Sequence, residues 1–191
     1  MNRPTASLLV LLTFFTLSIS YGQATNTSNK NNQLEWNEFY RLGWHDFQGE
    51  PTEESIGDAG TSVLIKAKPF YVKKKVVYDV YAYFNKRKSW SRDQSPELLA
   101  HEQLHFDIAE PYARKIRKKI AELSDRGVND VQVYNAAIRQ LLEESNEADL
   151  RYDGETLHGS MVRKQAAWEK KIKEELLSLQ KYKKEKRVIA G

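Results

Sequence analysis

The stretch between Ser95 and Gly127 constrains the fold more than any other part of the sequence, because it carries the signals of one long helix. Ser95 can cap free backbone amides, Pro96 suits the first helical position, and Gly127 is a typical stop. Pro111 lies inside this segment, where a proline removes one hydrogen bond and crowds the preceding turn. We therefore predict a kink or break over residues 107–111. The apolar face of the helix repeats at every fourth position: Leu104, Ile108, Tyr112, Ile116 and Ile120.

Two stretches before this helix show the period-two alternation of β-strands. They cover residues 61–67 and 76–84, and in each of them alternate positions are apolar. Lys73 to Lys75 lie between the two stretches and suit an exposed turn. The pattern predicts an antiparallel hairpin.

Two further helices are expected after the long one. Asn129 opens the first of them, and its apolar stripe includes Tyr134 and Ile138. The polar residues 149–159 are expected to form a loop, and residues 161–179 a last helix. Strands followed by helices are typical of an α+β fold, here a small antiparallel sheet followed by three helices.

The 191-residue chain is of a length that fits one domain. The apolar stretch Ser7–Ile19 follows a positive start and precedes small residues, which predicts a secretory signal peptide over residues 1–22. This stretch is too short for a membrane span, which needs about 20 apolar residues. We expect a polar linker over residues 23–33 and one domain over residues 34–191. The mature protein is then periplasmic or secreted.

The feature that indicates chemistry is the pair His101 and His105 with Glu102 between them. Residues four apart lie on the same face of a helix, so both imidazoles can reach one metal ion. Glu102 is offset by one residue, which places its carboxylate beside the ion, where a general base is needed. The chain has no cysteine, so any further ligand is His, Asp or Glu. This pattern predicts a zinc site of the metallopeptidase type.

A catalytic zinc ion usually takes a third protein ligand and leaves one position for water. His158 is the first choice, because it is one of only two other histidines and lies in a polar segment rich in possible ligands. The alternatives that remain open are Asp153, Asp107, Glu110 and His45.

Three blocks of the sequence resemble the bacterial family called domain of unknown function 922. They are Leu42–Pro51, Leu99–Glu110 and Tyr152–Gly159, the last of them followed by Gln165 and Trp168. Members of this family are called zinc-dependent proteases and are placed with the peptidases that carry the His-Glu-x-x-His motif. The resemblance implies a zincin-like fold with this motif on the active-site helix, and peptidase activity.

The expected mechanism is hydrolysis of peptide bonds by a zinc-activated water, with Glu102 as the general base. Tyr152 is a candidate donor to the developing oxyanion, although a packing role is an alternative for it. Asp153 or Asp107 can orient a histidine ligand. The edge of the hairpin can hold an extended peptide substrate.

Two other functions stay open. The first is a zinc-containing binding module without catalysis, which would leave Glu102 without a role. The second is an adhesion protein of the cell envelope that contacts an anionic surface through the C-terminal helix. The net charge of +4 does not indicate nucleic-acid binding, because much of the excess lies near the C-terminus, in Lys181, Lys183, Lys184, Lys186 and Arg187.

Overall fold

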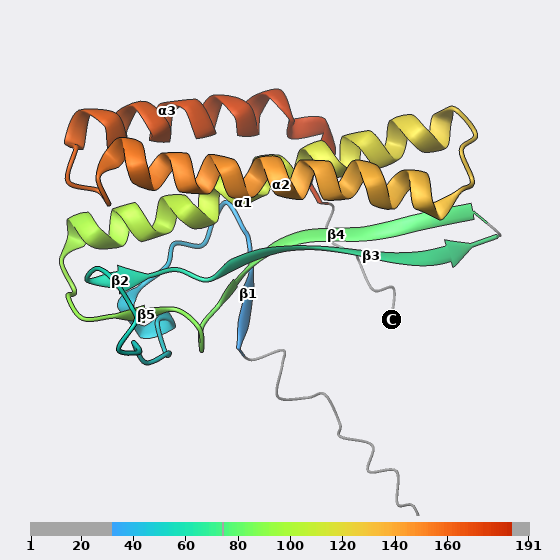
Figure 1. The fold of residues 1–191 in the computed structure, drawn as a ribbon. Helices are drawn as coiled ribbons and strands as arrows, with labels where there is room; N and C mark the ends of the chain where they lie inside the picture. The colour runs from blue at the N-terminus through green and yellow to red at the C-terminus, as the bar shows by residue number, and fades with distance from the viewer. Residues whose placement is uncertain (1–31, 74, 185–191) are drawn as a thin grey trace, which may run out of the picture.

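The computed structural model describes residues 32–73 and 75–184. The expected signal peptide and all but the last two residues of the expected linker lie outside the described residues. Strand β1 begins at Gln33, one residue before the expected start of the domain. The elements form two layers, with the sheet on one side and the helices on the other (Figure 1). The expected α+β layout, a small antiparallel sheet followed by three helices, is confirmed.

The main sheet has three antiparallel strands in the order β1-β4-β3. They are β1 (Gln33–Glu35), β3 (Val63–Val72) and β4 (Lys75–Asn85). The hairpin predicted from the alternating residues is therefore confirmed as β3 and β4, which pair from Val63 with Phe84 to Val72 with Lys75. A second, two-stranded sheet pairs β2 (Ala59–Gly60) with β5 (Trp90–Ser91), and the short helix η1 (Trp44–Asp46) lies between β1 and β2.

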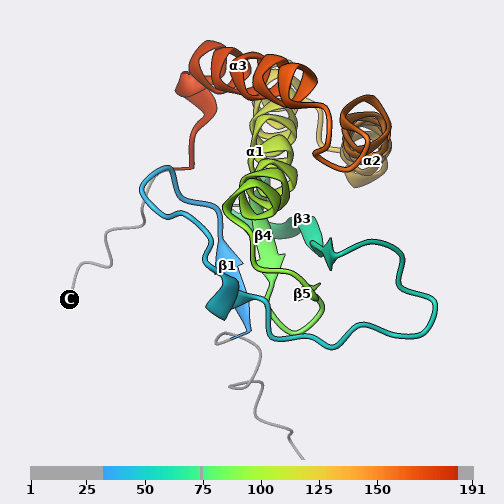
Figure 2. The same cartoon turned by 90° about the vertical axis from the view of Figure 1, so that its left-hand side faces the viewer.

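The core lies between strand β4 and helix α1 (Pro96–Asp125). Alternate residues of β4 face the helix, as the period of two requires. Figure 2 shows α1 between the sheet and α3, with α2 beside it, so the other elements cover α1 on several sides. The residues buried on the sheet side are Val76, Tyr78, Val80, Ala82, Ala109, Ala113 and Ile116.

Of the kink or break predicted over residues 107–111, the break is absent, because helix α1 runs continuously through Pro111. The proline removes one backbone hydrogen bond, but its neighbours are fixed by packing. Ile108 and Ile116 are at most 1% exposed. Burial of such side chains contributes about 1.5–3 kcal/mol each, which is enough to hold the helix together across one missing bond.

Helix α2 (Val131–Thr156) is longer than predicted, because it includes residues that were expected in a loop. Asp130 caps its start by accepting a hydrogen bond from the amide of Gln132. Its second half carries a buried stripe with helical spacing: Ser145, Ala148, Tyr152 and Thr156. Their burial against α1 outweighs the low helix propensity of this segment.

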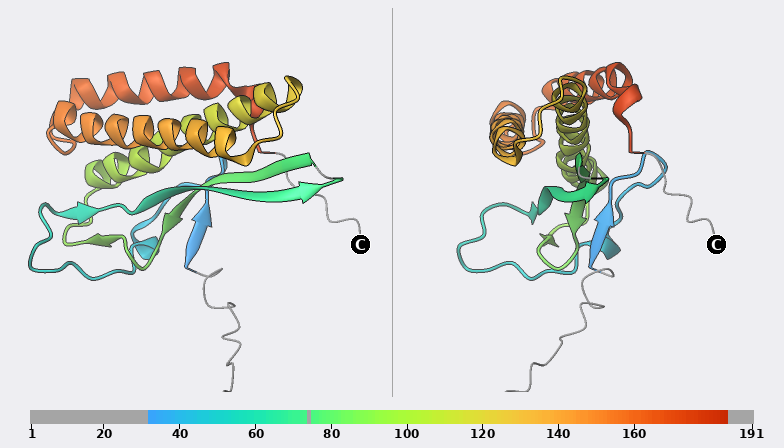
Figure 3. Two further views of the ribbon diagram at one scale, coloured as in Figure 1. Left: turned by 45° about the vertical axis from the view of Figure 1, so that its right-hand side comes forward. Right: turned by 90° about the vertical axis from the view of Figure 1, so that its right-hand side faces the viewer.

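The last helices are α3 (Val162–Ser178) and the short η2 (Gln180–Tyr182). The helix predicted over residues 161–179 is confirmed to within one residue at each end. Figure 3 shows α3 on the side of α1 that faces away from the sheet, and α2 beside α1. Among the described residues, no helix combines the length and the apolar character that a membrane span needs.

Candidate metal centre

Three side chains converge between α1 and α2. The Nε2 atoms of His101 and His105 each lie 3.1 Å from the same oxygen, Oδ1 of Asp153. Both histidines are buried, and Asp153 is half-buried. Within residues 32–73 and 75–184, these three form the one group of His, Cys, Asp or Glu side chains that could hold a metal ion, with ligand atoms within 4.8 Å of one another.

The donor atoms of this group fit a zinc ion. Two atoms that each lie about 2.1 Å from a shared ion can be at most about 4.2 Å apart, and the two His–Asp153 separations satisfy this limit. Two imidazoles and a carboxylate are also a ligand set that zinc accepts. The centre is therefore compatible with the metal expected from the sequence.

His105 is oriented by a second carboxylate. Its Nδ1 lies 2.6 Å from Oδ1 of Asp149, one helical turn before Asp153 on α2. With Nδ1–H donating to Asp149, loss of the proton on Nε2 would leave a lone pair on Nε2 directed toward the position of a metal. Sequence analysis missed Asp149. The spacing of the two aspartates could have indicated its role. Asp149 and Asp153 are four residues apart, as His101 and His105 are, so on a helix both carboxylates would lie on one face.

His101 is oriented by an amide instead. Its Nδ1 lies 3.4 Å from Oε1 of Gln165 on α3, which also accepts a hydrogen bond of 2.6 Å from the hydroxyl of Tyr152. An amide oxygen only accepts, so a proton on Nδ1 of His101 can be donated to Gln165, and this tautomer leaves Nε2 free for a metal. Gln165 appeared in the sequence as part of the family resemblance, but its contact with His101 could not be read from the pattern.

Tyr152 packs between the two histidines. Its ring stacks on His101 with centroids 4.7 Å apart and meets the edge of His105 at 4.9 Å. The side chain is fully buried, and burial raises the pKa of its hydroxyl well above the ordinary range. The hydroxyl contacts Gln165 and the backbone carbonyl of His101. These contacts support a positioning role for Tyr152 rather than the oxyanion donor expected from the sequence.

Glu102 has a carboxylate oxygen that is both buried and unpaired. The side chain is 4% exposed, and its Oε2 has no hydrogen-bond partner among the residues that the structure describes. Leaving a buried polar atom unpaired costs about 1–3 kcal/mol of stability, and the cost is higher for a charged group. Such an atom next to a group of metal ligands is typical of a functional site, where strain of this kind is retained.

The turn after α2 brings His158 near this group. Its Nδ1 lies 3.5 Å from Oδ1 of Asp153, but its side chain is 76% exposed. Leu157 and His158 have positive φ angles of 46° and 52°, so the chain turns sharply there. Asp153, one of the alternatives from the sequence, occupies the third place in the convergent group, whereas His158, the first choice, lies at its rim.

The other ligand alternatives lie elsewhere and have other partners. Asp107 accepts hydrogen bonds from Trp36 and Arg41. Glu110 is buried in ion pairs with Arg114 and Arg117, and His45 is an exposed residue beside Asp46. None of the three belongs to the convergent group.

Comparison with known families supports the resemblance noted in the sequence. Residues 81–159 match the family model described as "Bacterial protein of unknown function (DUF922)". The matched span includes the His-Glu-x-x-His motif and Asp153, and it ends at Gly159. The block Leu42–Pro51 lies outside the match. Neither the curated proteins nor the solved structures gave a significant match to this chain.

The electrostatics of the centre follow from its two carboxylates. Burial alone would lower the pKa of His105, but hydrogen bonds to Asp149 and Asp153 outweigh it and raise the pKa to about 10. Burial would raise the pKa of Asp153, but its contacts with His101 and His105 hold it well below the usual range. Without a metal, a proton on His105 therefore provides the positive charge that the carboxylates favour.

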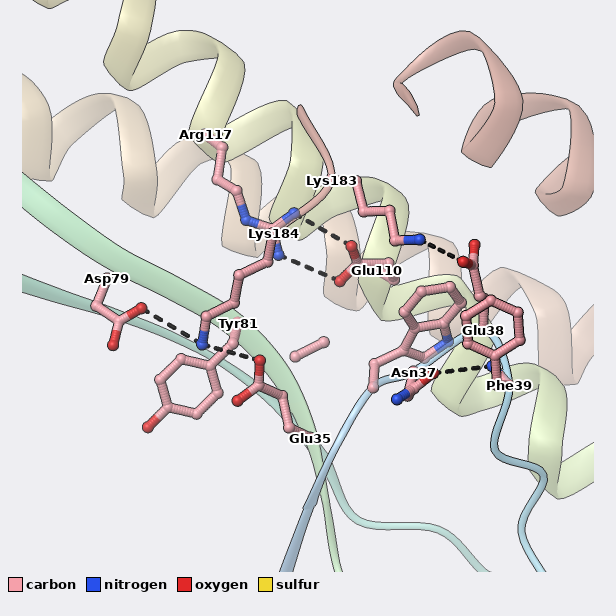
Figure 4. A pocket seen from close by; sticks show the side chains of 12 residues that line it. Glu35, Asn37, Glu38, Phe39, Asp79, Tyr81, Glu110, Arg117, Lys183 and Lys184 are labelled. Carbon is pink, nitrogen blue, oxygen red and sulfur yellow. Dashed lines mark hydrogen bonds and ion pairs between the residues drawn. The ribbon is translucent and has the colours of Figure 1, made fainter. Parts of the chain in front are cut away.

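A cavity of about 470 Å³ lies away from this centre, and the charged side chains that line it join parts of the fold to one another. Figure 4 shows that its charged side chains are paired with one another. Lys184 lies 2.8 Å from Glu35 and 3.4 Å from Asp79, and Arg117 contacts Glu110. These pairs hold the segment after η2 against β1, β4 and α1.

The ion pairs at this cavity include two of the basic residues near the C-terminus. Lys183 pairs with Glu38, and Lys184 pairs with the carboxylates named above. Two of the five basic residues near the C-terminus, Lys183 and Lys184, thus contact the protein itself, beyond the end of α3. Lys186 and Arg187 lie outside the described residues.

Proposed function

We propose that this protein is an exported, zinc-dependent metallopeptidase of the His-Glu-x-x-His type with a zincin-like active-site helix. The observation that carries the proposal is the convergence of His101, His105 and Asp153 beside the unpaired Oε2 of Glu102. A structural metal site has no use for a buried carboxylate oxygen that stays unpaired beside its ligands. A hydrolytic site needs one.

The roles of the side chains follow from their positions. His101, His105 and Asp153 would hold the ion, which when bound supplies a Lewis acid that makes water acidic near neutral pH. Asp149 and Gln165 fix the imidazole rings through their Nδ1 atoms. Oε2 of Glu102 is free to take a proton from water and to return it to the leaving amine. Tyr152 keeps both rings in place by stacking.

The experiment that tests this function combines metal content with peptide hydrolysis. We expect the purified full-length chain to bind one zinc ion for each molecule and to cleave peptides in a mixed synthetic library. Removal of zinc by a chelator should abolish cleavage, and added zinc should restore it.

The Glu102→Gln variant tests the mechanism. Glutamine keeps the size of the side chain but cannot take a proton, so we expect near-normal zinc binding and a loss of hydrolysis of at least about 100-fold. Glu122→Gln, at the exposed far end of the same helix, is the matched control and should cleave like the wild type. A Glu102→Gln protein that cleaves at the wild-type rate would rule out the mechanism and favour a binding module or an adhesion protein.

Export is part of the proposal and rests on the sequence alone. The apolar stretch Ser7–Ile19 and the small residues before Gln23 support cleavage after Gly22. Intact-mass measurement of the protein recovered from outside the cytoplasm should then give a chain that begins at Gln23.

A further inference from the structure

A cavity of about 210 Å³ adjoins the candidate metal centre. It lies between β3, α1 and α2, and both His105 and Asp149 are among the residues that line it. Figure 2 shows β3 and α2 on the same side of α1, so the cavity lies where the edge of the sheet meets the helices. A molecule that enters it is therefore held next to His105.

One wall of this cavity is apolar and suits an aliphatic group. That wall consists of Val63, Ile65, Ile108, Ala109 and Leu142, and the polar residues Thr61, Ser145 and Asn146 complete the lining away from His105 and Asp149. Its volume is below the range of about 300–1,000 Å³ that is typical of pockets for drug-sized ligands. It corresponds to roughly seven water molecules. The cavity thus has the size for one large aliphatic side chain and an apolar wall against which it can pack.

The strand beside the cavity has an unpaired edge. Strand β3 is the last in the sheet order β1-β4-β3, and no other strand in the described part of the chain pairs with it. The cavity is lined by three consecutive residues, Val63, Leu64 and Ile65. Because consecutive residues of a strand face opposite sides, a cavity that touches all three reaches around the strand's edge.

The hydrogen bonds of the sheet show which backbone groups face this edge. The carbonyl of Ser62 accepts from the amide of Asn85, so Ser62 is directed toward β4. Backbone groups alternate in an antiparallel strand, so the amide and carbonyl groups of Val63 and Ile65 are directed away from β4. The carbonyl of Ala82, which pairs with Ile65, confirms this because it accepts from Trp36 on the far side.

One more polar atom at this end is unpaired. Thr61 lines the cavity, and its hydroxyl oxygen is buried and finds no hydrogen-bond partner in the described part of the chain. Together with the backbone of Val63 and Ile65, it forms a row of free donors and acceptors next to an apolar cavity. An extended peptide offers the complementary groups.

We infer that this cavity is a specificity pocket, which receives an aliphatic side chain of an extended peptide that pairs with the free edge of β3. The peptide backbone then runs beside His105, and the side chain in the cavity fixes which bond lies at the metal centre. The inference rests on the proposed peptidase function, and it adds the substrate class: extended peptides with Val, Ile or Leu next to the cleaved bond.

The test uses a variant at the mouth of the cavity. Asn146 lines the cavity from α2 and is exposed, so Asn146→Trp should place an indole over the mouth without changing the core. Glu147→Trp, at the next exposed position of the same helix, is the matched control because Glu147 does not line the cavity. Circular dichroism and thermal unfolding check that both variants fold.

Cleavage of a degenerate synthetic peptide mixture by the zinc-loaded full-length protein gives the first readout. Mass spectrometry of the products should show aliphatic residues enriched at one position next to the cleaved bond. In Asn146→Trp, the preference for these residues over alanine should fall by at least about 10-fold, the lower end of what apolar pockets provide. Glu147→Trp should keep the wild-type preference.

Peptide binding gives a second readout that does not depend on catalysis. Zinc-loaded Glu102→Gln protein should bind fluorescent peptides that contain leucine more tightly than matched peptides with glycine, and addition of Asn146→Trp should remove the difference. If this binding pattern is found but the wild type cleaves nothing, the peptidase function fails and the pocket stands. Cleavage or binding without aliphatic preference, no binding at all, or equal behaviour of the two Trp variants would overturn the pocket.

Discussion

Oδ1 of Asp149 lies 2.6 Å from Nδ1 of His105, and this contact determines which ring nitrogen of His105 faces the metal centre. The two residues come from different helices, α2 and α1. A carboxylate that accepts from the far nitrogen of a histidine ligand raises the basicity of the near nitrogen and fixes the ring.

Replacing Asp149 should therefore weaken zinc binding without changing the fold. We expect Asp149→Ala to lower zinc affinity by about 10–100-fold, the range for such outer partners. Its carboxylate is 46% exposed, so the loss of stability should be small. Asp149→Asn should recover part of the affinity, because its amide oxygen still accepts a hydrogen bond. Competition with a chromogenic chelator measures the affinity, with Glu147→Ala as the control. Equal affinity in Asp149→Ala and the control would contradict this role.

A second pair of variants decides the third ligand. Asp153 contacts both histidines at 3.1 Å, whereas His158 is 76% exposed and contacts only Asp153 within the group. We expect Asp153→Ala to weaken zinc binding by more than about 100-fold, beyond the effect of an outer partner, and His158→Ala to weaken it less. The same chelator competition measures both variants. A larger loss in His158→Ala would restore the first choice made from the sequence.

Zinc binding should release a proton and should strengthen as the pH rises. In the metal-free protein the pKa of His105 is raised to about 10, so the ring is protonated at pH 7, whereas a ligand imidazole must be neutral. Asp153 adds no proton, because its pKa lies well below the usual range. Titration calorimetry in two buffers with different ionisation enthalpies should give about one proton released at pH 7. Identical binding enthalpies in both buffers would show that His105 is neutral before the metal binds.

The sequence predicted the elements whose signals are local. The alternation of apolar residues predicted the β3–β4 hairpin, and the Ser95–Pro96 start predicted helix α1, because each pattern follows directly from the geometry of its element. The His101–His105 pair was likewise visible, since four-residue spacing on a helix is a local property.

The errors concern residues whose state depends on distant contacts. Residues 149–156 have a polar composition that is typical of a loop, yet they are helical because Tyr152 and Thr156 are buried against α1. That error hid the spacing of Asp149 and Asp153, which matches the spacing of the two histidines across the interface. The choice between Asp153 and His158 depends on the direction of the turn at Leu157, and no local pattern reports it.

Gly159 is constrained in two ways, by its backbone conformation and by the side chain of His101 beside it. Its φ angle is 85°, which favours glycine, and an added Cβ would lie 3.0 Å from Cβ and Cγ of His101. Gly159→Ala should therefore destabilise the protein by about 1–3 kcal/mol and also displace His101, which lowers zinc affinity. Urea unfolding in the presence of a chelator measures the first effect, and chelator competition measures the second.

Variants at two other glycines separate the effect of the backbone conformation from the effect of the contact with His101. Gly127 has a φ angle of 72° but no atom within 4 Å of an added Cβ, so Gly127→Ala should destabilise the fold and leave zinc affinity unchanged. Gly154 lies inside α2 with open space around it, so Gly154→Ala should stabilise the helix by roughly 0.5–1 kcal/mol. If Gly159→Ala behaved like Gly127→Ala in both measurements, the contact with His101 would have no influence on the metal centre. A loss of zinc affinity in Gly159→Ala alone would show that the turn after α2 holds a ligand of α1 in place.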